Sequence, residues 1–151
     1  MTFNIKVSRH LRIPPFGLSN QQRFGLASLA IAQIRQRTAL GLDMNDRPAP
    51  PLSRNYQRRK VRLGLPGIPD LRLTGAMMKS LQVQSLEPSV TIGFTGARNI
   101  LKAGVNQGRR RQLGISDKDA DVLRQQGYAL LRENIRWSFG AIRRSFGAIA
   151  A

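Results

Sequence analysis

The most regular pattern of apolar positions in the chain lies between residues 20 and 40. Small or apolar side chains recur there at steps of three and four residues, which places them on one face of a helix. These positions are Phe24, Ala27, Ala30 or Ile31, Ile34 and Thr38. The polar positions around them are Arg23, Gln33, Arg35, Gln36 and Arg37. Ser19-Asn20 offers an N-cap and Gly41 a C-terminal stop, so the pattern predicts a helix over residues 20–40.

A second pattern, with a period of two, lies on either side of the turn Glu87-Pro88-Ser89. The alternating residues are Leu81, Val83, Ser85, Val90, Ile92 and Phe94. This alternation predicts a half-buried antiparallel hairpin over residues 81–95. Just before it, Thr74-Gly75 predicts the start of a short helix, in which the Thr74 side chain accepts hydrogen bonds from the first turn.

A last long helix is predicted from Ser116 to about Arg136. Ser116 and Asp119 have the spacing of a capping box, and Asp117, Asp119 and Asp121 suit the positive end of the helix dipole. The residues expected to be core are Val122, Leu123, Tyr128, Leu130, Leu131 and Ile135. Gly127 is expected to weaken the helix.

Both ends of the chain carry apolar residues without an evident partner. Pro14-Pro15 excludes a helix and favours an extended arm, which either packs on another chain or adds a strand to the local sheet. The motif SFGAI occurs at 138–142 and again at 145–149. This tail is interpreted as contacting a neighbouring subunit, the alternatives being a membrane surface or a frayed terminus. The candidate interface residues are Phe3, Ile5, Phe16, Trp137, Phe139, Ile142, Phe146 and Ile149.

These elements predict an α+β fold, in which two main helices pack on a small antiparallel hairpin. Residues 1–18 form the extended arm and residues 19–136 a single domain with a long loop at 43–70. Residues 137–151 form the interaction tail. Loops of this length are usually functional or disordered.

The charge of the chain suggests a binding role for the long loop at 43–70. The 151 residues carry a net charge of +17, which opposes compaction unless something negative lies nearby. The loop contains a basic cluster, in which Ser53 offers a cap for a short helix to about Arg62. The candidate contacts to a DNA backbone or an acidic partner are Arg54, Arg58, Arg59, Lys60, Arg62, Arg98, Lys102, Arg109, Arg110 and Arg111. The alternative is a solvated, mobile loop.

The residues needed for catalysis are scarce. The chain has no cysteine and one histidine, His10, which stands beside two prolines in the arm. The segment Gly93-Phe94-Thr95-Gly96 lacks the lysine of a phosphate-binding loop. We therefore expect no enzyme, no cofactor and no metal site. A signal-peptide core and an apolar run of roughly 20 residues are also missing, so we expect a soluble protein or part of a soluble assembly.

Three blocks of residues carry a family resemblance. The first comprises Asp43-Met44-Asn45-Asp46, Pro50-Pro51-Leu52-Ser53, Tyr56 and Lys60. The second comprises Pro69-Asp70-Leu71-Arg72-Leu73-Thr74-Gly75, Met78 and Ser80-Leu81. The third comprises residues 100–108, Arg111 and Leu113-Gly114-Ile115-Ser116, ahead of Asp119. Their order resembles the virion-morphogenesis and tail-completion proteins of tailed bacteriophages, although Gln112 stands where the family has an aromatic residue and Asn106 where it often has histidine.

The resemblance implies a structural virion protein, the α+β subunit of a homo-oligomeric ring in the neck at the head–tail junction. Its implied neighbours are other neck, portal-adaptor and tail-terminator or tail-tube proteins, with packaged DNA contacted non-specifically and no membrane. Such a subunit would be assembled in the host cytoplasm and reside in the virion. The charge also fits a basic, ribosomal-protein-like nucleic-acid-binding protein with extended arms, and the tail alone fits a cationic membrane-active protein.

Overall fold

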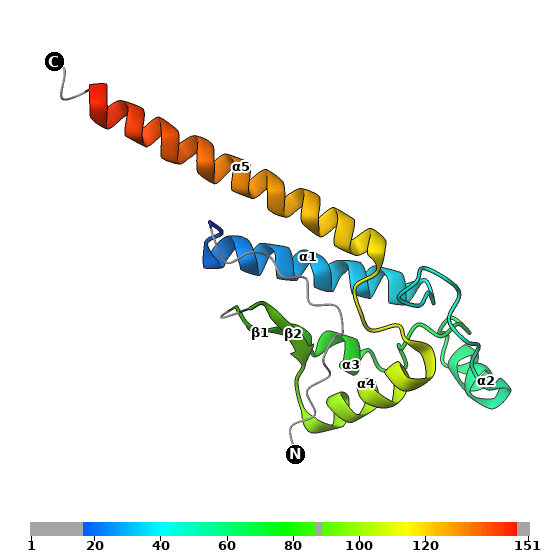
Figure 1. The fold of residues 1–151 in the computed structure, drawn as a ribbon. Helices are drawn as coiled ribbons and strands as arrows, with labels where there is room; N and C mark the ends of the chain where they lie inside the picture. The colour runs from blue at the N-terminus through cyan, green and yellow to red at the C-terminus, as the bar shows by residue number, and fades with distance from the viewer. Residues whose placement is uncertain (1–16, 87–88, 148–151) are drawn as a thin grey trace.

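A computed structural model describes residues 17–86 and 89–147, with side chains described as far as Arg136. The elements are α1 (Asn20–Ala39), α2 (Arg54–Arg62), α3 (Ala76–Lys79), β1 (Leu81–Ser85), β2 (Thr91–Phe94), α4 (Ala97–Arg110) and α5 (Asp117–Gly147). In Figure 1, α1 lies in the middle, with α5 along one side and the β1–β2 hairpin, α3 and α4 on the other. The predicted α+β fold is confirmed.

Helix α1 begins and ends where the sequence indicates. Ser19 and Gln22 form a capping box, in which the Ser19 hydroxyl accepts from the Gln22 backbone N–H at 3.2 Å. Gly41 follows the helix with a φ of 72°, the left-handed conformation that glycine adopts without strain.

The buried face of α1 differs from the predicted face at three positions, namely Phe24, Leu26 and Arg37. Phe24 is 53% exposed, whereas Arg37, assigned to the polar side, is buried. The reason is that α1 is covered by α5 on one flank and by the hairpin on the other. Burial therefore extends over Leu26 and Arg37 as well as over the expected stripe of Ala27, Ile31 and Ile34.

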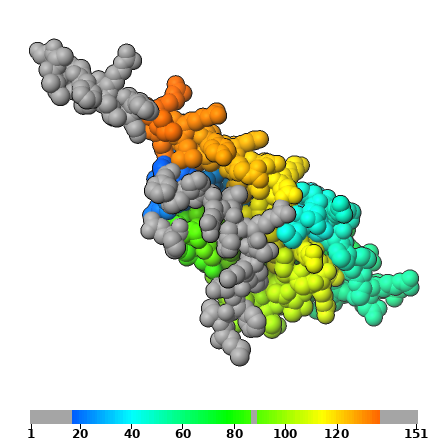
Figure 2. Space-filling view, in the orientation of Figure 1, coloured from blue at the N-terminus to red at the C-terminus, as the bar shows by residue number. Residues whose placement is uncertain are grey.

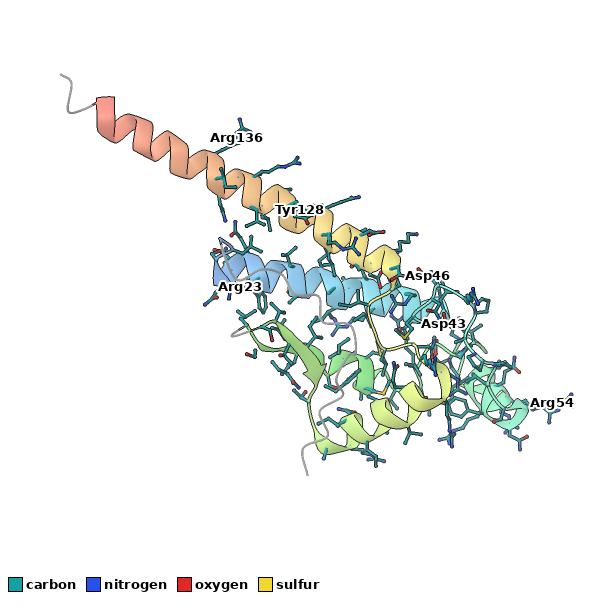
Figure 3. All side chains as sticks on the ribbon, in the orientation of Figure 1. Arg23, Asp43, Asp46, Arg54, Tyr128 and Arg136 are labelled. Atoms are coloured by element: carbon teal, nitrogen blue, oxygen red, sulfur yellow. The ribbon has the colours of Figure 1, made fainter. Side chains whose placement is uncertain are left out.

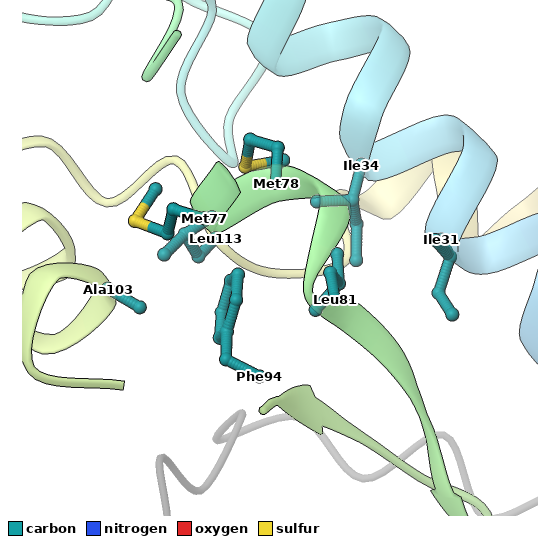
Figure 4. Packing of buried hydrophobic residues seen from close by; sticks show 8 residues of the cluster. All are labelled: Ile31, Ile34, Met77, Met78, Leu81, Phe94, Ala103 and Leu113. Carbon is teal, nitrogen blue, oxygen red and sulfur yellow. The ribbon is translucent and has the colours of Figure 1, made fainter. Parts of the chain in front are cut away.

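The hairpin has the predicted antiparallel pairing, with Leu81 opposite Phe94 and Val83 opposite Ile92. Glu87 and Pro88 of the expected turn lie outside the described residues. One face of the hairpin meets α1, α3 and α4 to form the apolar cluster in Figure 4. Its buried members are Ile31, Ile34, Met77, Met78, Leu81, Phe94, Ala103 and Leu113.

Helix α4 was not among the predicted elements. Gly104 and Gly108 lower its intrinsic helix propensity. The helix is instead stabilised by packing, because Ala103 is fully buried in the apolar cluster and Ile100 packs against that cluster. The three-residue step from Ile100 to Ala103 is the sequence signal that could have indicated it.

Helix α5 begins with the predicted capping box, since the Ser116 hydroxyl accepts from the Asp119 backbone N–H at 3.1 Å and an Asp119 carboxylate oxygen accepts from the Ser116 N–H at 3.0 Å. Its end was predicted wrongly, because the helix continues past Arg136 to Gly147. Tyr128 and Ile135, expected in the core, are 62% and 54% exposed. Only the side of α5 that carries Leu123 and Gly127 is buried.

The apolar ends are not described at the level of side chains. Phe3, Ile5, Phe16 and Ile149 lie outside the described residues, as do the side chains of Trp137, Phe139, Ile142 and Phe146 within α5. Their role as interface residues therefore stays a prediction. Along the parts of the chain that the structure describes, no helix has the length and apolar character needed to cross a bilayer.

Gly127 gives a test of the packing between α1 and α5. A Cβ at this position would lie 3.9 Å from Leu26 Cδ1, an ordinary van der Waals distance. We expect Gly127→Ala to raise the free energy of unfolding by about 0.5–1 kcal/mol, because alanine loses less backbone entropy in a helix. Chemical denaturation measures the change.

Gly41→Ala is the control for this substitution. Its left-handed φ and the 3.4 Å approach of Pro69 Cδ predict a loss of stability instead. A destabilised Gly127→Ala protein would show that α5 does not pack on α1 in this way.

Candidate functional site

The end of the molecule where α1 finishes is held by polar side chains that are almost fully buried. Four of the five largest fully buried side chains are polar, namely Lys60, Gln112, Thr38 and Ser116. Arg37 and Gln112 join segments that are far apart in the sequence, and Lys60 joins α2 to residues 68–70. We call these residues, together with their partners Asp70 and Asp119, the polar junction.

Lys60 is the only residue of α2 that is buried, at 1% exposure. Its ammonium forms an ion pair with the Asp70 carboxylate and donates to the Ile68 carbonyl at 2.8 Å. The same Asp70 oxygen accepts the backbone N–H of Arg72 at 2.9 Å. A buried charge needs such partners, so this pair fixes α2 against residues 68–72.

Arg37 makes the equivalent contact from the end of α1. Its guanidinium pairs with the Asp119 carboxylate and donates to the Gly114 carbonyl. Burial lowers the pKa of Arg37, while the carboxylates of Asp46 and Asp43 raise it. Because an arginine titrates far above neutrality, the guanidinium stays charged and holds the start of α5 against α1.

Gln112 connects these two ion pairs. Its side-chain NH2 donates to the Pro69 carbonyl at 2.5 Å and to the Leu42 carbonyl at 3.3 Å, and its backbone carbonyl accepts from the Arg37 guanidinium at 3.4 Å. The polar junction is therefore continuous from α2 through residues 68–70 and 112 to α1 and α5. A backbone bond from the Met44 N–H to the Arg111 carbonyl at 2.9 Å ties loop 43–53 to the same place.

The arginines of α2 lie outside the polar junction. Arg54, Arg58, Arg59 and Arg62 are all exposed, and in the described part of the chain none of them forms an ion pair. In the space-filling view α2 (teal) projects from the body of the molecule (Figure 2). Figure 3 places the Arg54 side chain at the outer end of this helix.

The C-terminal end of α4 approaches the segment that leads into α2. Arg110 donates to the Pro50 carbonyl at 3.3 Å and to the Asn106 side chain at 3.3 Å. Arg109 and Arg111 beside it are exposed. We define the cationic face as Arg54, Arg58, Arg59, Arg62, Arg109 and Arg111.

The ten predicted contact residues thus fall into four groups. The predicted contact role of Lys60 is wrong, because this side chain is buried and paired with Asp70. Arg110 is partly buried and tied to Pro50. Arg98 and Lys102 are exposed but lie in the half of α4 that is farther from α2 (Figure 1). The remaining six residues, which make up the cationic face, are exposed on α2 and at the C-terminal end of α4, which approaches the segment leading into α2.

Sequence reasoning missed the residues of the polar junction as a group. Arg37 was assigned to a solvated helix face and Asp119 only to a capping role. The signal that could have found them is the scarcity of acids, since only Asp43, Asp46, Asp70, Glu87, Asp117, Asp119, Asp121 and Glu133 are present. Every cation that is buried must be paired with one of these eight.

In the described residues no three His, Cys, Asp or Glu side chains are placed to hold a metal ion. Comparisons with models of protein families, with curated proteins and with solved structures find no match to this chain. The function is therefore argued from the residues and their geometry.

The pair of Lys60 and Asp70 makes a sharp prediction for stability. Lys60→Met leaves the Asp70 carboxylate buried without its counter-ion, and we expect unfolding free energy to fall by about 3–5 kcal/mol. Adding Asp70→Asn removes the unpaired charge and should recover a large part of that loss. Equilibrium denaturation of both variants tests this.

The matched control is Arg124→Gln, which removes an exposed pair with Asp121. We expect a change within about 0.5 kcal/mol there. If Lys60→Met changed stability as little as this control, the buried pair would not be what holds α2.

Proposed function

We propose that this chain is a structural virion protein, the subunit of a ring at the head–tail junction of a tailed bacteriophage. The ring would join the head connector to the tail around the DNA channel. The proposal rests on the resemblance carried by the three sequence blocks and on one observation about their residues in space.

That observation is the meeting of the three blocks at the polar junction. Lys60 of the first block pairs with Asp70 of the second, and the Met44 backbone N–H of the first donates to the Arg111 carbonyl of the third at 2.9 Å. The third block ends at Ser116, whose capping partner Asp119 pairs with Arg37. Residues that recur together for a structural reason are expected to touch, so these contacts support the resemblance.

The exposed side of α5 supports an assembling subunit. Tyr128 and Ile135 are exposed, seven residues apart and therefore on one side of the helix. Beyond them α5 extends well past the start of α1 (Figure 1), with no other described element beside it. A projecting helix with an apolar side is suited to packing on a neighbouring subunit.

A structural role also agrees with how the polar groups are used. Asp70 and Asp119 are each engaged in a buried ion pair, and the Asp43 carboxylate accepts the backbone N–H groups of Asn45 and Arg47 at 2.8 and 3.0 Å. These carboxylates hold the chain together. We therefore propose an assembly protein in preference to an enzyme.

Purified protein tests the proposal by sedimentation velocity and negative-stain microscopy. We expect closed rings, or oligomers that close into rings as concentration rises. A protein that stays monomeric at tens of micromolar, or that is missing from purified virus particles, would contradict it.

The second candidate function is a basic nucleic-acid-binding protein that works as a monomer, and the cationic face is the observation that favours it. Tight binding to RNA by a monomer, with no rings under any condition, is the outcome that would select it.

Removal of residues 138–151 tests whether the extended part of α5 joins subunits. We expect the truncated protein to keep its melting temperature, because the described core residues all precede the cut, and to lose its oligomers. Ile135→Gln should weaken assembly in the full-length chain.

Leu101→Gln is the matched control, since Leu101 is also exposed, at 65% against 54% for Ile135, but lies on α4. Normal assembly by the truncated protein and by Ile135→Gln would exclude α5 as the joining element. A lowered melting temperature of either variant would instead assign these residues to the core.

A further inference from the structure

We propose that the cationic face binds the sugar–phosphate backbone of duplex DNA without reading its sequence. In the proposed ring the duplex would be packaged DNA, and that identification rests on the proposed function. The binding itself is a property of the single chain and can be measured separately.

The first step is that α2 buries one of its cations and exposes the others. Five of its nine residues are Arg or Lys, and only Lys60 is buried, opposite Asp70. Asp70 is engaged by Lys60, and in the described part of the chain none of the other four cations of α2 forms an ion pair. Arg54, Arg58 and Arg62 stand at four-residue steps and so lie on one side of the helix.

The second step is the absence of acids around that side. Residues 50–69 and 89–116, which include α2 and α4, contain no Asp or Glu. Figure 3 places Asp43 and Asp46 beside the end of α1, while Arg54 lies at the far end of α2. Like charges four residues apart destabilise a helix. The arrangement is therefore held at a cost that an anionic partner would remove.

The third step compares the spacing of positive charges along α2 with the spacing of phosphates along a DNA strand. A helix of nine residues is about 13 Å long, so the four exposed arginines give one positive charge per roughly 3.4 Å. One strand of B-DNA carries one phosphate per about 3.4 Å of helix axis. Guanidinium groups also match phosphate geometry, because they donate two parallel hydrogen bonds.

The fourth step selects duplex over single strands. Single-stranded nucleic acids are held largely by bases stacked on exposed aromatic rings. Tyr56 is the one aromatic residue of α2, at 38% exposure, and α4 has none. Backbone contact without stacking is what double-stranded DNA offers.

The experiment compares two variants that lose the same charge. One carries Arg54→Gln, Arg58→Gln, Arg59→Gln and Arg62→Gln. The control carries Lys79→Gln, Lys118→Gln, Arg132→Gln and Arg136→Gln, four exposed cations on other elements. Fluorescence anisotropy with a labelled 20-base-pair duplex of mixed sequence is recorded over a range of salt concentrations, and sedimentation velocity reports the assembly state in the same buffers.

We expect the α2 variant to bind at least tenfold more weakly and the slope of log K against log salt to become shallower by about 3–4, as four lost phosphate contacts require. The control should change the slope by less than about 1. Equal losses in both variants would show that only the net charge matters and would overturn the proposal.

Two competitors separate other partners from duplex DNA. A poly-glutamate peptide that binds as tightly as the duplex would assign the face to an acidic protein surface. Single-stranded RNA that binds more tightly than the duplex would assign it to RNA. Rings without DNA binding would overturn this inference and leave the proposed function standing, and DNA binding by a strict monomer would do the reverse.

Discussion

The structure depends on the requirement that a charge removed from water must meet an opposite charge or a carbonyl. Arg37 and Lys60 are both buried, and each finds a carboxylate and a backbone oxygen. Gln112 links the two sites through hydrogen bonds to residues 42 and 69. The apolar cluster holds the hairpin against α1, α3 and α4, but α2 contributes no residue to it. The buried ion pair of Lys60 and Asp70 is therefore a main contact that positions α2, and an unpaired charge there would cost more stability than a lost methyl group in the apolar cluster.

The sequence predicted those elements whose signals are local. The capping residues Ser19 and Ser116, the stop at Gly41 and the alternation around residues 81–95 each act within a few residues, and all were found where expected. Helix α4 was missed because Gly104 and Gly108 obscure its periodicity, and its stability comes from the contact of Ala103 with residues distant in sequence. The burial of Arg37 could not be foreseen either, because its partner Asp119 is 82 residues away.

The candidate site was predictable in composition but not in geometry. The basic clusters at 54–62 and 98–111 were evident from charge alone. The sequence did not show which lysine or arginine of α2 is buried, because that depends on which side of the helix meets Asp70. Exposure of Tyr128 and Ile135 was missed for a related reason: a hydrophobic period shows which residues share a face, but not whether a second element covers that face. No element within the described residues covers Tyr128 and Ile135, and a periodic pattern alone does not reveal this.

The Lys60–Asp70 contact also fixes which side of α2 faces the body of the molecule. If α2 were to advance by one residue, Val61 or Arg59 would stand opposite the Asp70 carboxylate. Valine would leave that charge unneutralised, and the longer, planar guanidinium would not fit the space of a lysine ammonium that also reaches the Ile68 carbonyl. A change of register would therefore leave the buried Asp70 charge without its lysine, at a cost in stability. Substitution of a surface arginine would change only the charge that α2 presents, whereas substitution of Lys60 would also remove the contact that orients the other arginines.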